Sequence, residues 1–180
     1  MNIRVVLLAM ALAAPATAGR ASEIVLHFDE AQVGKPVTAY TNSGVVFVPA
    51  REPKLSRAKA RVMFFPHLKT EHKGILNAMA NEPIPVEVRF PHGATSATLV
   101  FWGSTGCPAL VEAYDKDGKV VDKAALASVP DRTSPAEPVP TVELTVKAPE
   151  ISYIRFSGQR TGEYLAAQEL RYTPPAGQTN

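Results

Sequence analysis

The sequence has one cysteine, Cys107, so no disulfide can form within the chain, and a zinc or redox site built from several cysteines is excluded. A free thiol leaves pairing with a second molecule open. Neither sign of charge dominates: 19 basic and 17 acidic residues give a formal net charge of +2, which predicts no nucleic-acid partner. No apolar run reaches the roughly 20 residues that a membrane-spanning helix needs, so we expect no membrane span.

Motifs of common enzymes are also missing. The sequence has no Gly-x-Ser-x-Gly, no His-Glu-x-x-His and no phosphate-binding loop with Gly-Lys-Ser/Thr. Cys107 follows a glycine-rich turn, but no neighbouring base is recognisable that could activate its thiol. We therefore expect no enzymatic activity.

Residues 1–18 have the pattern of a secretory signal peptide. Arg4 precedes an apolar run at 5–14, and small residues occupy the −3 and −1 positions before a cleavage site after Ala18. This pattern predicts a secreted or periplasmic protein. A chain of 180 residues has room for one ordinary domain, which we place at 19–172, followed by a flexible tail at 173–180.

The body of the chain alternates apolar and polar residues with a period of two, as strands do. Asp115 to Gly118 lies between two such runs and predicts a hairpin, because Asp-Gly suits the positive-φ position of a tight turn. Arg51 to Ala60 is basic and irregular and is predicted as a loop. Many short strands without a long amphipathic helix predict an all-β fold, an antiparallel β-sandwich. The expected strands are 24–29, 45–48, 84–90, 97–102, 109–114, 120–125, 142–146, 151–156 and 164–172.

Several short motifs resemble a large group of exported bacterial domains with a galactose-binding-like jelly roll, the fold of many carbohydrate-binding modules. They are Phe28-Asp29, Gly34, Tyr40 and GVVF at 44–47, AYDKDGKVV at 113–121, ISYIRFSG at 151–158, and the closing strand 165–172. The resemblance extends to domains of PEP-CTERM-sorted proteins, although the Pro-Glu-Pro sorting tail is missing here. It implies a jelly-roll sandwich and carbohydrate as the leading ligand class.

The resemblance also implies a structural calcium. In galactose-binding-like domains the first and last strands lie close together, and a carboxylate from each often binds this ion. Asp29, Glu30 and Glu169 are the candidate ligands, completed by carbonyl oxygens of the turn at 30–35. The alternative is that these are solvated turn acids, with Gln168 marking a lost site.

Trp102, the one tryptophan, and Tyr114 are the first candidates for a ligand-binding platform, because the apolar face of a sugar ring stacks on aromatic rings. Both faces of the Trp102 strand are apolar, so packing in the core is the alternative for both residues. Tyr40 and Arg61 are further candidates in predicted loops.

Together these features predict a monomeric, exported, non-enzymatic binding domain with glycan as the leading partner class. The alternative is a structural or protein-interaction component of the cell envelope.

Overall fold

The computed structural model describes residues 21–28, 37, 43–50, 61–65, 72–76, 85–103, 106–130, 134, 137, 140–158 and 165–178. These residues form strands and turns, and every pairing between the strands is antiparallel. In the described part no helix is long or apolar enough to cross a membrane. The strands are β1 (Ile24–His27), β2 (Val46–Pro49), β3 (Arg61–Phe65), β4 (His72–Leu76), β5 (Val86–Gly103), β6 (Ala109–Tyr114), β7 (Val120–Leu126), β8 (Val142–Gly158) and β9 (Leu165–Thr173).

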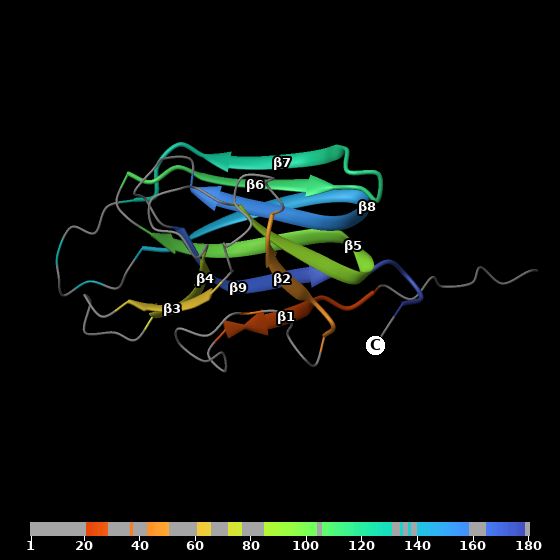
Figure 1. Cartoon of the computed structure of the whole chain (residues 1–180), viewed down its shortest axis with the longest axis horizontal. Helices are drawn as coiled ribbons and strands as arrows, with labels where there is room; N and C mark the ends of the chain where they lie inside the picture. Colours follow the sequence, from red (N-terminus) through yellow and green to blue (C-terminus); the bar gives the residue numbers. More distant parts are fainter. Residues whose placement is uncertain are drawn as a thin grey trace, which may run out of the picture.

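Two long strands, β5 and β8, create the two layers of the sandwich. Both fold back at the same end of the molecule, on the right in Figure 1, and they pair with each other on both sides of the bend. Their register shifts between Arg89 and Ala94, at Pro91-His92-Gly93, where Gly93 has φ 75°. A proline and a positive-φ glycine allow such a turn without ending the strand pair.

We call the two layers sheet I and sheet II. Sheet I contains β2, the first part of β5, the second part of β8, β6 and β7. Sheet II contains the first part of β8, the second part of β5, β9, β1, β4 and β3. Each sheet therefore has its own outer face, while β5 and β8 contribute to both.

The core lies between the layers and is built from alternate residues of each strand. Phe101 from sheet II and Phe156 from sheet I meet with ring centroids 5.4 Å apart, and both are essentially inaccessible to solvent. Phe28 and Phe47 make an edge-to-face contact at 5.4 Å. Burial of this apolar surface is the main driving force for stacking the two sheets. The predicted fold class, an all-β antiparallel jelly-roll sandwich, is confirmed.

The predicted hairpin at Asp115 to Gly118 is also confirmed. The Asp115 N–H donates to the Lys119 carbonyl at 3.0 Å, and the Gly118 N–H donates to the Asp115 carbonyl at 3.2 Å. Gly118 has φ 79°, and Asp115 Oδ1 accepts hydrogen bonds from the N–H groups of Asp117 and Lys119. This turn fixes the position of Tyr114, the last residue of β6.

Two features of the chain differ from the sequence-based expectation. The predicted strands 84–90 and 97–102 are parts of the single strand β5, and 142–146 and 151–156 are parts of β8. In addition, β3 and β4 form a hairpin in a region where no strand was predicted. Their sequences, RVMFF and HKGIL, lack a clear alternation of apolar and polar residues. They are recognised as strands by their backbone pairing and not by their sequence pattern.

Candidate functional site

The outer face of sheet I presents two neighbouring rows of side chains at right angles to the strands. The first row crosses four strands in register and alternates in charge: Glu87, Arg155, Glu112 and Lys123. The second row, one pleat away, contains Arg89, Tyr153 and Tyr114. Because side chains two residues apart on a strand share a face, both rows face away from the core.

Glu87 is the buried centre of this face, with its side chain only 5% exposed. Its Oε1 accepts from Arg89, with Nε at 2.7 Å and Nη2 at 2.6 Å. Its Oε2 accepts from Arg155, with Nε at 3.0 Å and Nη2 at 2.9 Å. We call these three residues the Glu87 triad. One carboxylate thus holds two guanidinium groups through charge-assisted hydrogen bonds, which fix both side chains in place.

Tyr114 and Tyr153 lie beside the triad as a tyrosine pair. Their rings are nearly parallel, with 6° between the planes and centroids 4.8 Å apart. The Arg155 Cζ is 4.9 Å from the Tyr114 centroid and 5.4 Å from the Tyr153 centroid, within the range of a cation–π interaction. Tyr153 is partly exposed, whereas Tyr114 is 9% exposed, so Tyr153 offers more surface to a ligand.

Glu112 contacts both Tyr114 and Lys123. Its Oε2 accepts from the Tyr114 hydroxyl at 2.8 Å, and its Oε1 lies 3.4 Å from Lys123 Nζ. Burial raises the pKa of the Tyr114 phenol, and the hydrogen bond to Glu112 and the charge of that carboxylate raise it further, while Arg155 opposes them. Tyr114 is therefore a neutral donor across the physiological pH range.

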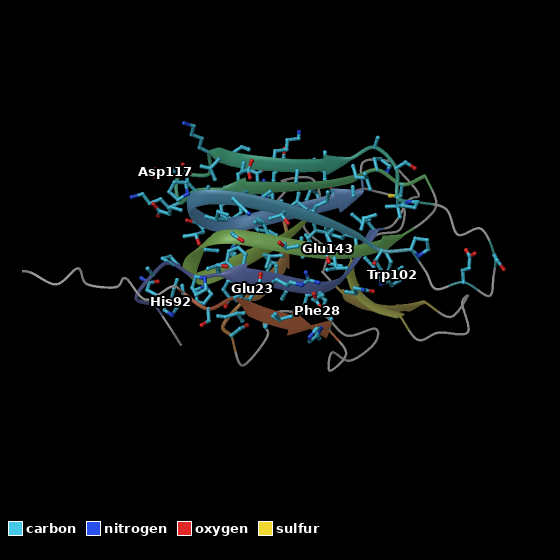
Figure 2. All side chains as sticks on the ribbon, turned by 180° about the vertical axis from the view of Figure 1, so that it is seen from behind. Glu23, Phe28, His92, Trp102, Asp117 and Glu143 are labelled. Carbon is cyan, nitrogen blue, oxygen red and sulfur yellow. The ribbon has the colours of Figure 1, made fainter. Side chains whose placement is uncertain are left out.

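Trp102 and Tyr114 do not form the expected platform. Trp102 is the next-to-last residue of β5, is 1% exposed, and lies at the opposite end of the molecule from Asp117, which belongs to the β6–β7 turn after Tyr114 (Figure 2). Its cross-strand partner on β9 is Ala166, also fully buried. Of the two orientations that the sequence left open for Trp102, the structure shows the buried one. The ring that joins Tyr114 is Tyr153 instead.

Of the two remaining predicted ligand-binding residues, the structure describes only the backbone of Arg61. Tyr40 lies outside the described residues. Arg61 begins β3, where its backbone pairs with Leu76 at the far side of sheet II, and its side chain is not described.

Of the predicted calcium ligands, only Glu169 lies within the described residues; Asp29 and Glu30 lie outside them. Glu169 Oε2 is 2.9 Å from His27 Nδ1, and its Oε1 accepts from Arg171 Nε. The hydrogen bond to Glu169 raises the pKa of the Arg171 guanidinium, with burial opposing. No three His, Cys, Asp or Glu side chains of the described chain gather around a common point. Calcium at Asp29, Glu30 and Glu169 stays a prediction.

No protein-family model matches the chain, and no curated protein matches it either. Solved structures with a similar shape include a mutant of CBM29-2, a family 29 carbohydrate-binding module, with 12% identity over 87% of this chain and 94% of that chain and a TM-score of 0.46. Another is the family 11 carbohydrate-binding module of the cellulase Lic26A-Cel5E of Clostridium thermocellum, with 10% identity over 89% of this chain and 99% of that chain and a TM-score of 0.41.

The chain also resembles part of the arabinose-bound MgGH51 α-L-arabinofuranosidase, with 14% identity and a TM-score of 0.42. The similar region covers 88% of this chain but only 26% of the length of that enzyme. At these TM-scores the comparisons describe a similarity of shape, and any function has to be argued from the site itself.

The sequence contained a partial signal for the sheet I face. In the predicted strand 84–90, Glu87 and Arg89 share the side opposite the apolar residues Val86 and Val88, and the structure confirms this division. What sequence reasoning missed was that Tyr153 and Arg155 lie opposite these residues on β8. That juxtaposition depends on pairing between strands more than 60 residues apart, as the Arg155–Glu87 bond shows.

Proposed function

We propose that this protein is an exported, non-enzymatic domain that binds carbohydrate on the outer face of sheet I. The observation that carries the proposal is the tyrosine pair held beside the Glu87 triad. The C–H faces and edges of a sugar ring pack on aromatic side chains, while guanidinium groups donate planar hydrogen bonds to its oxygens. This face offers both kinds of contact within two adjacent rows.

The rigidity of these side chains supports a binding role. Glu87 fixes the two guanidinium groups, and Glu112 fixes the Tyr114 hydroxyl. A ligand that contacts side chains already held in one geometry loses less of its binding free energy to ordering them. The contacts of Glu87 and Glu112 support the non-enzymatic part of the proposal, because these two carboxylates are engaged by cations and by Tyr114 rather than placed for proton transfer.

The proposal is tested by titrating the purified chain with a panel of soluble polysaccharides and following binding by calorimetry, with and without calcium. Saturable binding to one polysaccharide class that Tyr153→Ala abolishes supports the site. Tyr153→Phe, which keeps the ring, should retain most of the affinity. Arg171→Ala, on the outer face of sheet II, is the control and should bind as the unaltered chain does.

Two results would contradict the proposal. Binding that persists in Tyr153→Ala would place the ligand elsewhere on the molecule. Absence of saturable binding to any polysaccharide would remove carbohydrate as the ligand class, and capture of a specific envelope protein would then support the structural or interaction role. Loss of binding in chelator would support the calcium prediction at Asp29, Glu30 and Glu169.

A further inference from the structure

The charges on the outer face of sheet I do not balance. The first row, Glu87, Arg155, Glu112 and Lys123, contains two acidic and two basic side chains and is neutral. Arg89 lies in the next row and contacts the same carboxylate as Arg155. Pairing within the sheet would need one guanidinium for Glu87, and the structure provides two. Among the described side chains of these two rows there is therefore one positive charge in excess.

The hydrogen bonds of the face also leave a donor, rather than an acceptor, without a partner among the described residues. Both Glu87 oxygens accept from arginine, and Glu112 accepts from Tyr114 and lies beside Lys123. In the described structure, Arg89 uses only Nε and Nη2, both for Glu87, so its Nη1 has no protein acceptor there. The two carboxylates of these rows are thus already engaged, whereas Nη1 of Arg89 is not.

Arg89 is also accessible and well placed. Its side chain is 50% exposed, in contrast to the 5% of Glu87 below it. In the strand register Arg89 lies directly opposite Tyr153, the more exposed ring of the tyrosine pair. A group that contacts Arg89 therefore sits next to the surface on which a sugar ring would pack.

From these three observations we propose that the ligand of this face is an acidic saccharide, whose carboxylate binds Arg89 while its ring packs against Tyr153. This inference rests on the proposed function and narrows it from carbohydrate in general to uronate-containing polymers. A carboxylate supplies the acceptors and the negative charge that the face lacks, and its planar geometry matches the planar guanidinium group. A neutral sugar hydroxyl supplies no charge and is a donor as well as an acceptor.

The experiment compares each acidic polymer with a neutral one of the same backbone. Polygalacturonate and polymannuronate are titrated into the full chain beside their carboxyl-reduced forms, in which each carboxylate has become a hydroxymethyl group. We expect at least one polyuronate to bind about tenfold or more tightly than its reduced form, as the loss of a charge-assisted hydrogen bond predicts. The preference should shrink as the ionic strength is raised.

Single substitutions at Arg89 and at a control arginine test whether Arg89 is the residue that binds the carboxylate. Arg89→Gln should reduce the affinity for the polyuronate about tenfold and bring it close to that for the reduced polymer. Glu87 keeps Arg155 as its partner in this variant, so the fold should be retained, which the thermal unfolding midpoint checks. Arg171→Gln is the control, because Arg171 makes a comparable contact with two glutamates, Glu143 and Glu169, on the other sheet.

The outcomes separate the inference from the proposed function. Equal affinity for a polyuronate and its reduced form, both dependent on Tyr153, would overturn the acidic ligand and leave carbohydrate binding intact. If the Arg89→Gln variant still prefers the polyuronate over its reduced form to the same extent, Arg89 does not bind the carboxylate and its proposed role is overturned. Equally tight binding of poly-glutamate, which has carboxylates but no sugar, would show simple charge attraction and overturn the saccharide. If neither polymer of any pair binds, the inference and the proposed function fail together.

Discussion

Tyr153 lies opposite two residues at once, Arg89 on one neighbouring strand and Tyr114 on the other. Its ring stacks on Tyr114 with the planes 6° apart, while the register places the Arg89 side chain on its other flank. A cationic donor and an aromatic surface therefore meet at one side chain in the middle of a sheet face. Four measurements test this arrangement and the packing around it.

Glu87→Gln should destabilise the fold by about 2–4 kcal/mol, because it leaves two guanidinium groups without their buried counter-charge. Chemical denaturation of the variant measures this loss. Glu143→Gln is the matched control: Glu143 also pairs with an arginine, Arg171, but is 53% exposed, so its replacement should change stability by less than about 1 kcal/mol. Equal effects of the two substitutions would contradict the assigned role of Glu87.

The raised pKa of Tyr114 predicts a dependence of stability on alkaline pH. The folded state favours the neutral phenol, so its contribution is fully present below the pKa of an unfolded tyrosine, near 10, and is lost as the pH rises through the higher folded value. Unfolding measured from pH 8 upward should show a steeper loss for the unaltered chain than for Tyr114→Phe. Identical profiles would show that Tyr114 ionises as it does in the unfolded chain.

Trp102 gives an intrinsic fluorescence test, since it is the only tryptophan of the chain. With 1% of its surface exposed, we expect blue-shifted emission, weak quenching by iodide and no change on adding a saccharide ligand. Trp102→Ala should lower the free energy of unfolding by about 3–5 kcal/mol. Strong iodide quenching in the folded state, or a ligand-dependent spectrum, would instead support the platform expected from the sequence.

Cys107 should be protected from thiol reagents in the folded protein, because it is fully buried next to the Gly106–Val129 backbone hydrogen bond. Its modification should follow the fraction of unfolded chains as denaturant is added, and no disulfide-linked dimer should form under native conditions. Rapid labelling without denaturant would show that the segment around Cys107 opens easily. A disulfide between Cys107 and a second molecule would then again be compatible with the folded protein.

The sequence predicted features formed within one segment better than contacts between segments far apart in the chain. The hairpin at Asp115 to Gly118 was predictable because its hydrogen bonds and its positive φ involve residues within a single turn. The division of β5 into two predicted strands was incorrect because Pro91 and Gly93 usually interrupt a strand, whereas here the pairing with β8 continues past them.

The candidate site was predictable only in part for the same reason. Alternation placed Glu87 and Arg89 on the side of their strand away from the apolar residues. Their partners Tyr153 and Arg155 come from β8, and strand order and register between distant segments cannot be derived from the pattern of either strand alone. Tyr114 was identified as a site candidate, but the ring that stacks on it was not.

The bent strands β5 and β8 have a consequence for how the molecule moves. Because each runs through both layers, the sheets cannot slide past one another or separate without breaking the β5–β8 pairing in the interior. Amide hydrogens of these two strands should therefore exchange only through global unfolding, together with one another. The face that carries Arg89 and Tyr153 is built on these same strands, so we expect it to keep its shape in the absence of a ligand. Under the proposed function it would then select among ligands by rigid complementarity.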